Sequence, residues 1–269
     1  MMSMAEAGRR SSTTPSVVVV GAGIGGLAAA LRLALQGLDV TLVEAAATPG
    51  GKMRQLVVDG AAVDAGPTVF TMRWVFDELL AGSGTQLDEL IALQPLQLLA
   101  RHAWRGSERR LDLHTDPRRS AEAIGDFAGA AEARRFETFC RETRAVLAAL
   151  EGPYMRGQRP TMLGLTRELG LRGMATLAAL GPFTSLWRAL GRHFRDPRLR
   201  QLFGRYATYC GASPWQAPAT LMLVAQVEQD GVWSVDGGMH ALACAVAALA
   251  QRRGVRLRCA APVTRIVVE

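Results

Sequence analysis

The residues whose types and spacing could do chemistry begin with the run Gly21-Ala22-Gly23-Ile24-Gly25-Gly26. This run fits the pattern G-x-G-x-x-G. In that pattern the first glycine permits a tight turn, the second lets a pyrophosphate approach the main chain, and the third allows a helix to pack closely on a strand. Backbone N–H groups and the positive end of the helix would hold the phosphates. An isolated match to this pattern is as often a simple turn as a dinucleotide-binding loop. The neighbouring sequence must therefore show which of the two is present.

The context of this run predicts a βαβ unit. Ser16–Val20 is a β-branched run typical of a parallel strand buried on both faces, and Gly25–Gly37 has the Ala/Leu pattern of a helix. Asp39–Glu44 is the expected second strand. Glu44 lies 18 residues past Gly26, where its carboxylate could accept hydrogen bonds from ribose hydroxyls and would repel a 2′-phosphate. The unit therefore indicates FAD or NAD and disfavours NADP.

A second glycine pair, with two cations beside it, favours FAD over NAD. In Pro49-Gly50-Gly51-Lys52-Met53-Arg54, Lys52 and Arg54 could reach the pyrophosphate of an extended dinucleotide through charge-assisted hydrogen bonds. The alternative is a β-turn with two solvated cations.

The elements that must position these residues follow from the downstream pattern. Gln55–Val58 and Ala61–Asp64 flank Asp59-Gly60 as a hairpin would, and Arg73–Leu80 has helical spacing. Leu96–Leu113 alternates like paired strands, and Ser120–Leu150 is again helical. The regular βαβ rhythm stops in this part of the chain.

A change of composition toward Leu, Ala, Gly, Met and Pro between Gln158 and Trp187 marks an inserted helical region. Within it, Met174–Trp187 is interrupted by Gly181-Pro182 and is too short to span a bilayer. Two interpretations remain open, a buried helix pair and an interfacial or channel-lining segment flanked by arginines.

The last part of the chain returns to alternating helix and strand. Met239–Arg252 is an expected helix, and Val255–Arg258 and Val263–Val268 are expected strands, with the chain ending inside the last one. The expected organisation is a disordered tail (1–15), the first part of the nucleotide-binding domain (16–115), a mostly helical region (116–230), and a truncated return to the first domain (231–269).

The composition argues against several classes of protein and site. The net charge of +7 comes almost wholly from arginine, since Lys52 is the only lysine, and no compact basic tract interleaved with aromatics indicates nucleic-acid binding. The four cysteines are widely separated, which predicts neither a metal site nor a redox pair. No signal peptide is expected, and the glycines of Val17–Leu35 argue against a transmembrane span there.

With these residues identified, the chain resembles the phytoene-desaturase-like flavoproteins, which share a fold with the amine oxidases. The resemblance extends over essentially the whole chain and is carried by four segments: Val17–Arg54, Val63–Met72, Gly204–Thr220 and Gly231–Val255. It implies an α/β fold, namely a Rossmann-like FAD-binding domain with an inserted, largely helical region for substrate or membrane. Members of the family are nearly twice as long, so the chain corresponds to an N-terminal part.

The resemblance also implies which residues bind FAD and which reaction follows. The implied cofactor-binding residues are Gly21, Gly23, Ile24, Gly25, Gly26, Glu44, Gly51, Lys52, Arg54, Gly66, Pro67, Thr68 and Val263. The segments GPTVFTMRWVFDELL and RHAWRGSERRLDLH resemble most the hydroxyneurosporene desaturase subfamily. The expected reaction is FAD-dependent 3,4-desaturation of an acyclic 1-hydroxycarotenoid. The expected place is the cytoplasmic face of the inner or photosynthetic membrane, with peripheral attachment.

Alternatives to this function also follow from the residues. Another amine-oxidase-fold enzyme would have the same dinucleotide motif but a more polar pocket, and a chain lacking its second half could be an inactive flavin-binding fragment. No catalytic residue is assigned. His240 and Arg205 are the ionisable residues to test as a base, although both are more often structural. The electron acceptor is not specified by these residues.

Overall fold

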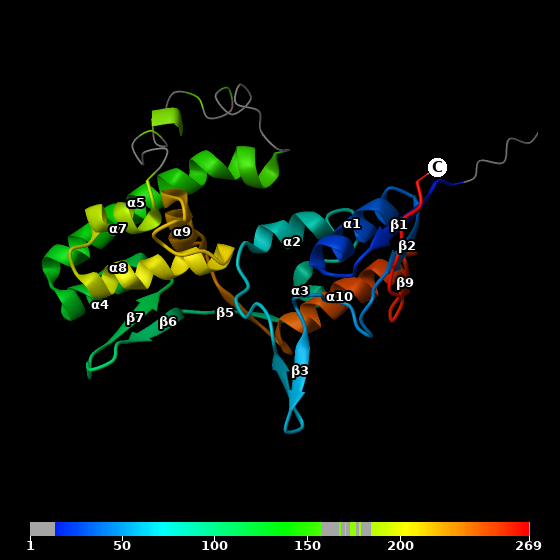
Figure 1. Ribbon diagram of the computed structural model, residues 1–269, viewed down its shortest axis with the longest axis horizontal. Coiled ribbons are helices and arrows are strands. Elements are labelled where there is room, and N and C mark those ends of the chain that lie inside the picture. Colours follow the sequence, from blue (N-terminus) through cyan, green and yellow to red (C-terminus); the bar gives the residue numbers. More distant parts are fainter. Residues whose placement is uncertain are drawn as a thin grey trace, which may run out of the picture. The chain divides into compact units, whose positions relative to one another are not determined.

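A computed structural model describes residues 14–157, 167, 170, 173–175, 178 and 184–268 (Figure 1). The chain divides into two compact units. Unit 1 comprises Met1–Gln94 and Ser234–Glu269, and unit 2 comprises Pro95–Trp233. The expected tail, residues 1–15, lies almost entirely outside the described residues.

Unit 1 is built on a parallel sheet in the order β1-β2-β9. Strand β1 (Ser16–Val20) pairs with β2 (Asp39–Val43), and β2 pairs with β9 (Arg256–Arg258). Helices α1 (Ile24–Leu35) and α10 (Gly238–Arg252) pack against each other beside this sheet. The side chains between these layers are fully buried: Leu27, Ala30, Leu31, Val40, Leu42, Leu242, Ala243 and Val246. The predicted βαβ unit is therefore present.

Two strand predictions in unit 1 were wrong in part. Strand β1 was expected to be buried on both faces, but Val18 is 63% exposed and Val20 is 56% exposed. The strand stands at the edge of the sheet, and its outward side chains have no covering layer among the described residues. Residues 263–268, expected as a strand, have no regular structure. A strand needs a neighbour for its N–H and C=O groups, and no such pairing forms here within the described ranges.

The remaining elements of unit 1 follow their sequence signals closely. Strands β3 (Gln55–Val58) and β4 (Ala61–Asp64) form an antiparallel hairpin. Its turn residues Asp59 and Gly60 both have positive φ, 49° and 81°, as a two-residue hairpin turn requires. Helices α2 (Arg73–Leu80) and α3 (Leu87–Leu90) follow. A capping box between Gln86 and Glu89 caps the N-terminus of α3.

Unit 2 is mainly helical. It contains α4 (Pro117–Ala128), α5 (Ala130–Leu150), the π-helical turn η1 (Glu151–Arg156), α7 (Leu186–His193), α8 (Pro197–Gly204), the 3-10 turns η2 (Arg205–Cys210) and η3 (Ala219–Met222), and α9 (Leu223–Gln229). The expected helical stretch 120–150 is two helices, because Gly129 adopts φ 99° between them. Phenylalanines 136, 139, 194 and 203 form a stacked and tilted aromatic core.

The hairpin of β6 (Leu98–Ala103) and β7 (Arg110–His114) belongs to unit 2. Sequence analysis placed residues 16–115 together in the first domain. The difference arises because Leu111 and Leu113 are buried in the same core as the phenylalanines. Strands β5 (Leu93–Pro95) and β8 (Trp233–Val235) pair where the chain leaves and re-enters unit 1.

None of the helices in the described ranges combines the length and apolar character needed to cross a bilayer. Half of the segment Met174–Trp187, interpreted from sequence as buried or interfacial, lies outside the described residues.

Candidate dinucleotide-binding site

The first glycine loop joins β1 to α1 and is held by main-chain contacts. Gly21 adopts φ +94°, and its N–H donates to the carbonyl oxygen of Val43 over 2.7 Å. A Cβ on Gly26 would overlap with the carbonyl oxygen of Gly21, whereas a Cβ on Gly25 would meet nothing within 4 Å. Gly26 therefore permits the close contact between helix and loop that the motif predicts, and Gly25 is under no such constraint.

The second glycine segment packs on the first, and the third packs on the second, in both cases backbone to backbone. The N–H of Gly50 donates to the carbonyl oxygen of Ala22 over 2.8 Å, and a Cβ on Gly51 would lie 3.1 Å from the Cα of Gly23. A Cβ on Gly66 would overlap with the carbonyl oxygen of Lys52. Three glycine segments that are separate in sequence are thus joined through main-chain contacts.

Glu44 directly follows β2, beside the first glycine loop. Its carboxylate accepts hydrogen bonds from the N–H of Ala22 (2.6 Å) and from the N–H of Ala46 (2.9 Å). Each carboxylate oxygen has a second lone pair that could accept a ribose hydroxyl. The same side chain therefore orders the glycine loop and presents an acceptor at the predicted ribose position.

The other predicted site residues lie around this surface. The side chains of Lys52, Arg54, Pro67 and Thr68 are exposed. Val263 is 44% exposed and follows Ala261, whose N–H donates to the carbonyl oxygen of Glu44 over 2.9 Å. The segment before Val263 thus passes beside Glu44. The FAD-binding role of every residue in the set stays a prediction.

Two residues that support the loops were not assigned this role from sequence. Asp64 accepts a hydrogen bond from the N–H of Met239 over 2.6 Å, at the start of α10. His240 contacts the carbonyl oxygen of Met53 through Nδ1 (2.8 Å) and the Sγ of Cys244 through Nε2 (3.4 Å). The sequence predicted a helix over Met239–Arg252, but not these contacts, which join residues 175 and 187 positions apart. His240, considered as a base, is engaged on both ring nitrogens and supports the second glycine turn.

Arg205, the other candidate base, belongs to a buried polar cluster in unit 2. Glu228 accepts hydrogen bonds from the guanidinium of Arg205 (2.7 Å) and the hydroxyls of Tyr206 and Tyr209 (3.0 Å each). Burial, and then the Glu228 charge, raises the pKa of Tyr206 well above its usual value and that of Tyr209 to about 12. Both phenols are therefore protonated donors near neutral pH. These contacts give Arg205 a structural role.

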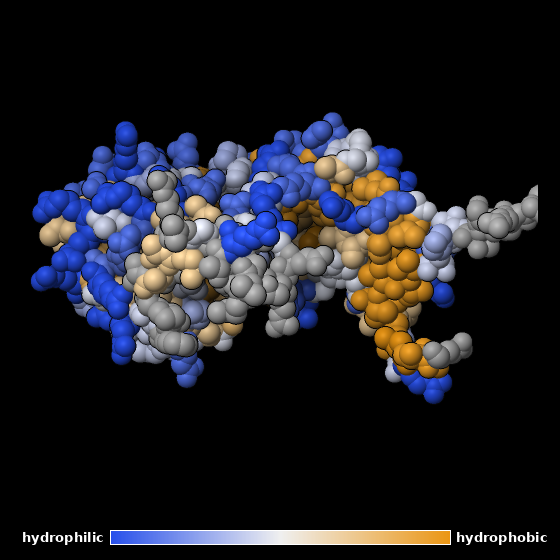
Figure 2. Space-filling model, turned by 90° about the horizontal axis from the view of Figure 1, so that it is seen from above, coloured by the Kyte–Doolittle hydropathy of each residue, from blue (hydrophilic) through white to orange (hydrophobic). Residues whose placement is uncertain are grey.

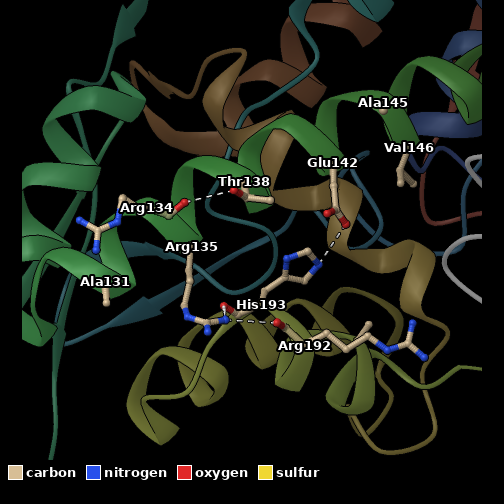
Figure 3. A pocket seen from close by; sticks show the side chains of 10 residues that line it. Ala131, Arg134, Arg135, Thr138, Glu142, Ala145, Val146, Arg192 and His193 are labelled. Atoms are coloured by element: carbon tan, nitrogen blue, oxygen red, sulfur yellow. Dashed lines mark hydrogen bonds and ion pairs between the residues drawn. The ribbon is translucent and has the colours of Figure 1, made fainter.

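A cavity of about 810 Å³ lies within unit 2 between α5 and α7 (Figure 3). His193 turns toward Glu142, at 3.3 Å from Nε2 to Oε2, while the guanidinium groups of Arg134 and Arg192 lie at opposite ends of the view. Because these cations diverge, they do not create a single binding point for an anion. The glycine segments do not line this cavity.

No three His, Cys, Asp or Glu side chains gather as a metal site would require in the part of the chain that the structure describes. The four cysteines are free thiols.

Comparison with known proteins places this chain in a family. The model of flavin containing amine oxidoreductases matches residues 24–269. The chain belongs to this family. A member described as hydroxyneurosporene desaturase from Rubrivivax gelatinosus is 66% identical over 91% of this chain and 47% of its own length. Another of that description, from Cereibacter sphaeroides, is 50% identical over 94% of this chain and 51% of its own length. The chain spans about half the length of the curated relatives it matches.

Among solved structures, an oxidoreductase from Methanosarcina mazei aligns with a TM-score of 0.57 and 16% identity, covering 94% of this chain and 53% of the other. At this identity the likeness shows the fold alone. Family membership and fold together confirm the expected α/β class with a Rossmann-like flavin-binding domain, and FAD as the cofactor of the family.

Proposed function

We propose that this chain is the flavin-holding part of an FAD-dependent carotenoid desaturase. Its proposed reaction is 3,4-desaturation of an acyclic 1-hydroxycarotenoid. The observation that carries the flavin assignment is the packing of Gly50-Gly51 on the Gly21–Gly26 loop, to which Glu44 is hydrogen-bonded. The carotenoid assignment is supported by the two relatives described as hydroxyneurosporene desaturases, at 66% and 50% identity.

The residues of this chain would hold FAD by main-chain and charged contacts. The N–H groups that open α1 would bind the pyrophosphate, because the helix dipole favours negative charge there. Lys52 and Arg54 would add cations near the phosphates, and Glu44 would accept from the ribose hydroxyls. Gly66, Pro67 and Thr68 would lie beside the isoalloxazine, where small or rigid residues permit close approach. When bound, the flavin supplies the hydride acceptor that oxidation of an allylic C–C bond requires.

The substrate class sets a second requirement, an apolar and dry environment for a long polyene. From sequence, the residues expected to line it fall between Met162 and Trp187, largely outside the described residues.

The flavin site is tested by binding. Titration of the apoprotein with FAD should show saturable binding, and Glu44→Ala should weaken it about tenfold to a hundredfold, because charge-assisted hydrogen bonds to the ribose contribute about 1.5–3 kcal/mol. Glu108→Ala, at an exposed carboxylate in the β6–β7 turn, is the matched control and should bind like the wild type. Equal FAD affinity of Glu44→Ala and wild type would contradict the assignment.

The reaction is tested by turnover in the flavin-loaded protein. Incubation with 1-hydroxylated and with plain acyclic carotenes should give a product only, or far faster, with the hydroxylated substrate. Equal turnover of both would contradict the subfamily assignment. Turnover of an amine instead would favour the amine-oxidase alternative.

Peripheral membrane association belongs to the same proposal, because the substrate partitions into lipid and the net charge of +7 favours an anionic leaflet. In a sedimentation assay, the protein should pellet with anionic vesicles at low salt and be released at high salt. Failure to pellet at low salt would exclude this attachment.

A further inference from the structure

Two of the four cysteines, Cys244 and Cys259, are brought together by the fold of unit 1. Cys244 lies on α10 and Cys259 directly follows β9, and the chain turns back between them at Gly254, which adopts φ 93°. From Cys244 the helix continues for about 12 Å to its end at Arg252, and from Val255 the chain returns over about 13 Å to Cys259. Since α10 packs against β9, the two cysteines lie at the same level of this helix and strand.

The side chain of Cys259 is on the face of the sheet that the helices cover. Leu257 stands in register with Leu42, which is fully buried on that face. Side chains two residues apart along an extended chain share a face, so Cys259 is on the same side as Leu257. The exposure of the residues agrees, because Leu257 and Cys259 are partly buried, whereas Arg256 and Arg258 are exposed.

The electrostatics of Cys244 also indicate that the two thiols are neighbours. Burial raises the pKa of the Cys244 thiol, and the nearby Cys259 raises it further, because two adjacent thiolates repel each other. Cys244 is therefore protonated near neutral pH. It must lose this proton before its sulfur can act as a nucleophile.

His240 is placed to accept that proton. Its Nδ1 lies 2.8 Å from the carbonyl oxygen of Met53, and since a carbonyl oxygen only accepts, Nδ1 carries the hydrogen. In the neutral ring Nε2 is then an acceptor, and it lies 3.4 Å from the Sγ of Cys244, whose thiol donates to it. Both cysteines are only partly buried, which leaves them accessible to a small oxidant.

We propose that Cys244 and Cys259 are a site of oxidative modification, a peroxide-reactive thiol pair in which His240 takes the proton of Cys244. In the first step the Cys244 sulfur attacks one oxygen of hydrogen peroxide and the O–O bond breaks. The leaving hydroxide takes the proton from His240 and departs as water, and Cys244 becomes a sulfenic acid.

In the second step the Cys259 sulfur attacks the sulfenic sulfur and the S–O bond breaks. The hydroxide that leaves takes the Cys259 proton and forms a second water, and a disulfide results. The two thiols together lose two electrons, which reduce the peroxide to water.

The disulfide would join two segments that border the predicted FAD site. His240, one helical turn before Cys244, supports the second glycine turn, and Ala261, two residues after Cys259, donates its N–H to the carbonyl oxygen of Glu44. A disulfide restricts the unfolded chain, so oxidation should raise the melting temperature. This thiol pair goes beyond the proposed function, and its test needs no flavin.

The experiment treats the purified full chain with stoichiometric hydrogen peroxide, blocks the remaining thiols and digests the denatured protein with trypsin. Cys259 then lies in peptide 259–265, and Cys244 lies in peptide 206–252, which also contains Cys210. The two peptides should be joined by a disulfide in the wild type and equally in Cys210→Ser, the matched control at an exposed thiol. In the Cys210→Ser background, Cys244→Ser and Cys259→Ser should each abolish the link.

The reaction is run in dilute protein to favour a bond within one chain. Figure 2 shows a band of hydrophobic surface over the sheet end of unit 1, and chains that associate through such a surface would favour disulfides between molecules. On a non-reducing gel the oxidised protein should therefore remain a monomer.

Thermal unfolding, followed by circular dichroism, shows that each variant is folded. Oxidation should raise the melting temperature of the wild type and of Cys210→Ser, and a reducing agent should reverse the change. His240→Gln has an amide that can still donate to the carbonyl oxygen of Met53, but it has no basic nitrogen. This variant should form the link about tenfold more slowly than the wild type.

Three results would overturn the proposal. The first is a folded protein in which peroxide produces no link between peptides 206–252 and 259–265. The second is a disulfide that forms instead through Cys140 or Cys210, or between two chains. The third is a folded His240→Gln variant that forms the link at the wild-type rate.

Discussion

The two neighbouring glycines at the start of α1 differ sharply in what their positions allow. Gly26→Ala would drive a methyl group into the carbonyl oxygen of Gly21 and must displace the loop, whereas Gly25→Ala points into open space. We expect Gly26→Ala to lower FAD affinity at least tenfold and to lower the melting temperature. Gly25→Ala should preserve both, or raise stability slightly, because alanine favours the helix.

FAD titration and thermal unfolding, followed by circular dichroism, would measure this pair. A Gly25→Ala variant as impaired as Gly26→Ala would mean that the loop needs flexibility throughout, and not one close contact.

At the residue scale, the sequence predicts those site residues whose positions are determined by their near neighbours in the chain. Gly21, Gly26 and Glu44 stand at fixed distances along one βαβ unit, so their spacing indicates their positions. Asp64 and His240 act through contacts to residues 175 and 187 positions away, and nothing in their neighbourhood indicates those partners.

At the scale of elements, Ser16–Val20, Gln55–Val58, Ala61–Asp64 and Arg73–Leu80 have the bounds that periodicity and turn residues predict. The two strand errors in unit 1 have one cause. A β-branched run predicts a strand, but it does not indicate which elements lie beside that strand. The sequence therefore did not show that β1 is covered on one face only, or that residues 263–268 form no strand. Strand formation depends on pairing, which lies outside the local sequence.

The buried carboxylate of Glu228 joins two elements, α9 and the 3-10 turn η2. Glu228→Gln would leave the guanidinium of Arg205 without its counter-charge in a largely buried position. Breaking such a pair costs about 3 kcal/mol, toward the lower end of the usual range because the Arg205 side chain is 32% exposed. Tyr209→Phe removes one donor only and should cost about 1 kcal/mol.

Urea unfolding would measure the free energy of unfolding of each variant. Glu137→Gln, at an exposed position of α5, is the matched control and should change stability by less than about 0.5 kcal/mol. If Glu228→Gln behaved like this control, the cluster would not hold the two elements together.

At the scale of the whole molecule, the boundary between the units is the feature least accessible from sequence. The alternating pattern of the β6–β7 hairpin predicts paired strands, but it does not indicate which unit the hairpin joins. Its place is set by Leu111 and Leu113 entering the phenylalanine core, a long-range packing choice. The amino-acid composition indicated the helical region only through the Leu-, Ala-, Gly-, Met- and Pro-rich stretch between Gln158 and Trp187.

The stability of the whole chain should depend on pH through the buried His193 and the partly buried His102. Burial lowers the pKa of His193 below 6.5, helped by Arg192 and Arg135 and opposed by Glu142. Burial also lowers the pKa of His102, helped by Arg205 and opposed by Glu228 and Asp112. In both cases the folded state resists protonation more than the unfolded chain does.

The sign follows from proton linkage. Above about pH 7 both histidines are neutral in either state, and their contribution to stability is complete. As the pH falls through 6.5 the unfolded chain binds protons first, so the free energy of unfolding should fall until the folded-state pKa values are passed. The arginine-bonded carboxylates Asp112 and Asp196, whose pKa values are lowered from 3.8, act in a separate window below about pH 4.

As the pH is lowered from 8 to 5, the urea concentration at the midpoint of unfolding should therefore decrease for the wild type. It should decrease less for a His102→Gln/His193→Gln variant. The difference between the two proteins should grow as the pH falls below 6.5, because the wild-type histidines bind protons more readily in the unfolded chain than in the folded one. Parallel curves for wild type and variant would show that the loss of stability in this range arises from other groups. In that case the contact of His193 with Glu142 would offset the cost of its burial.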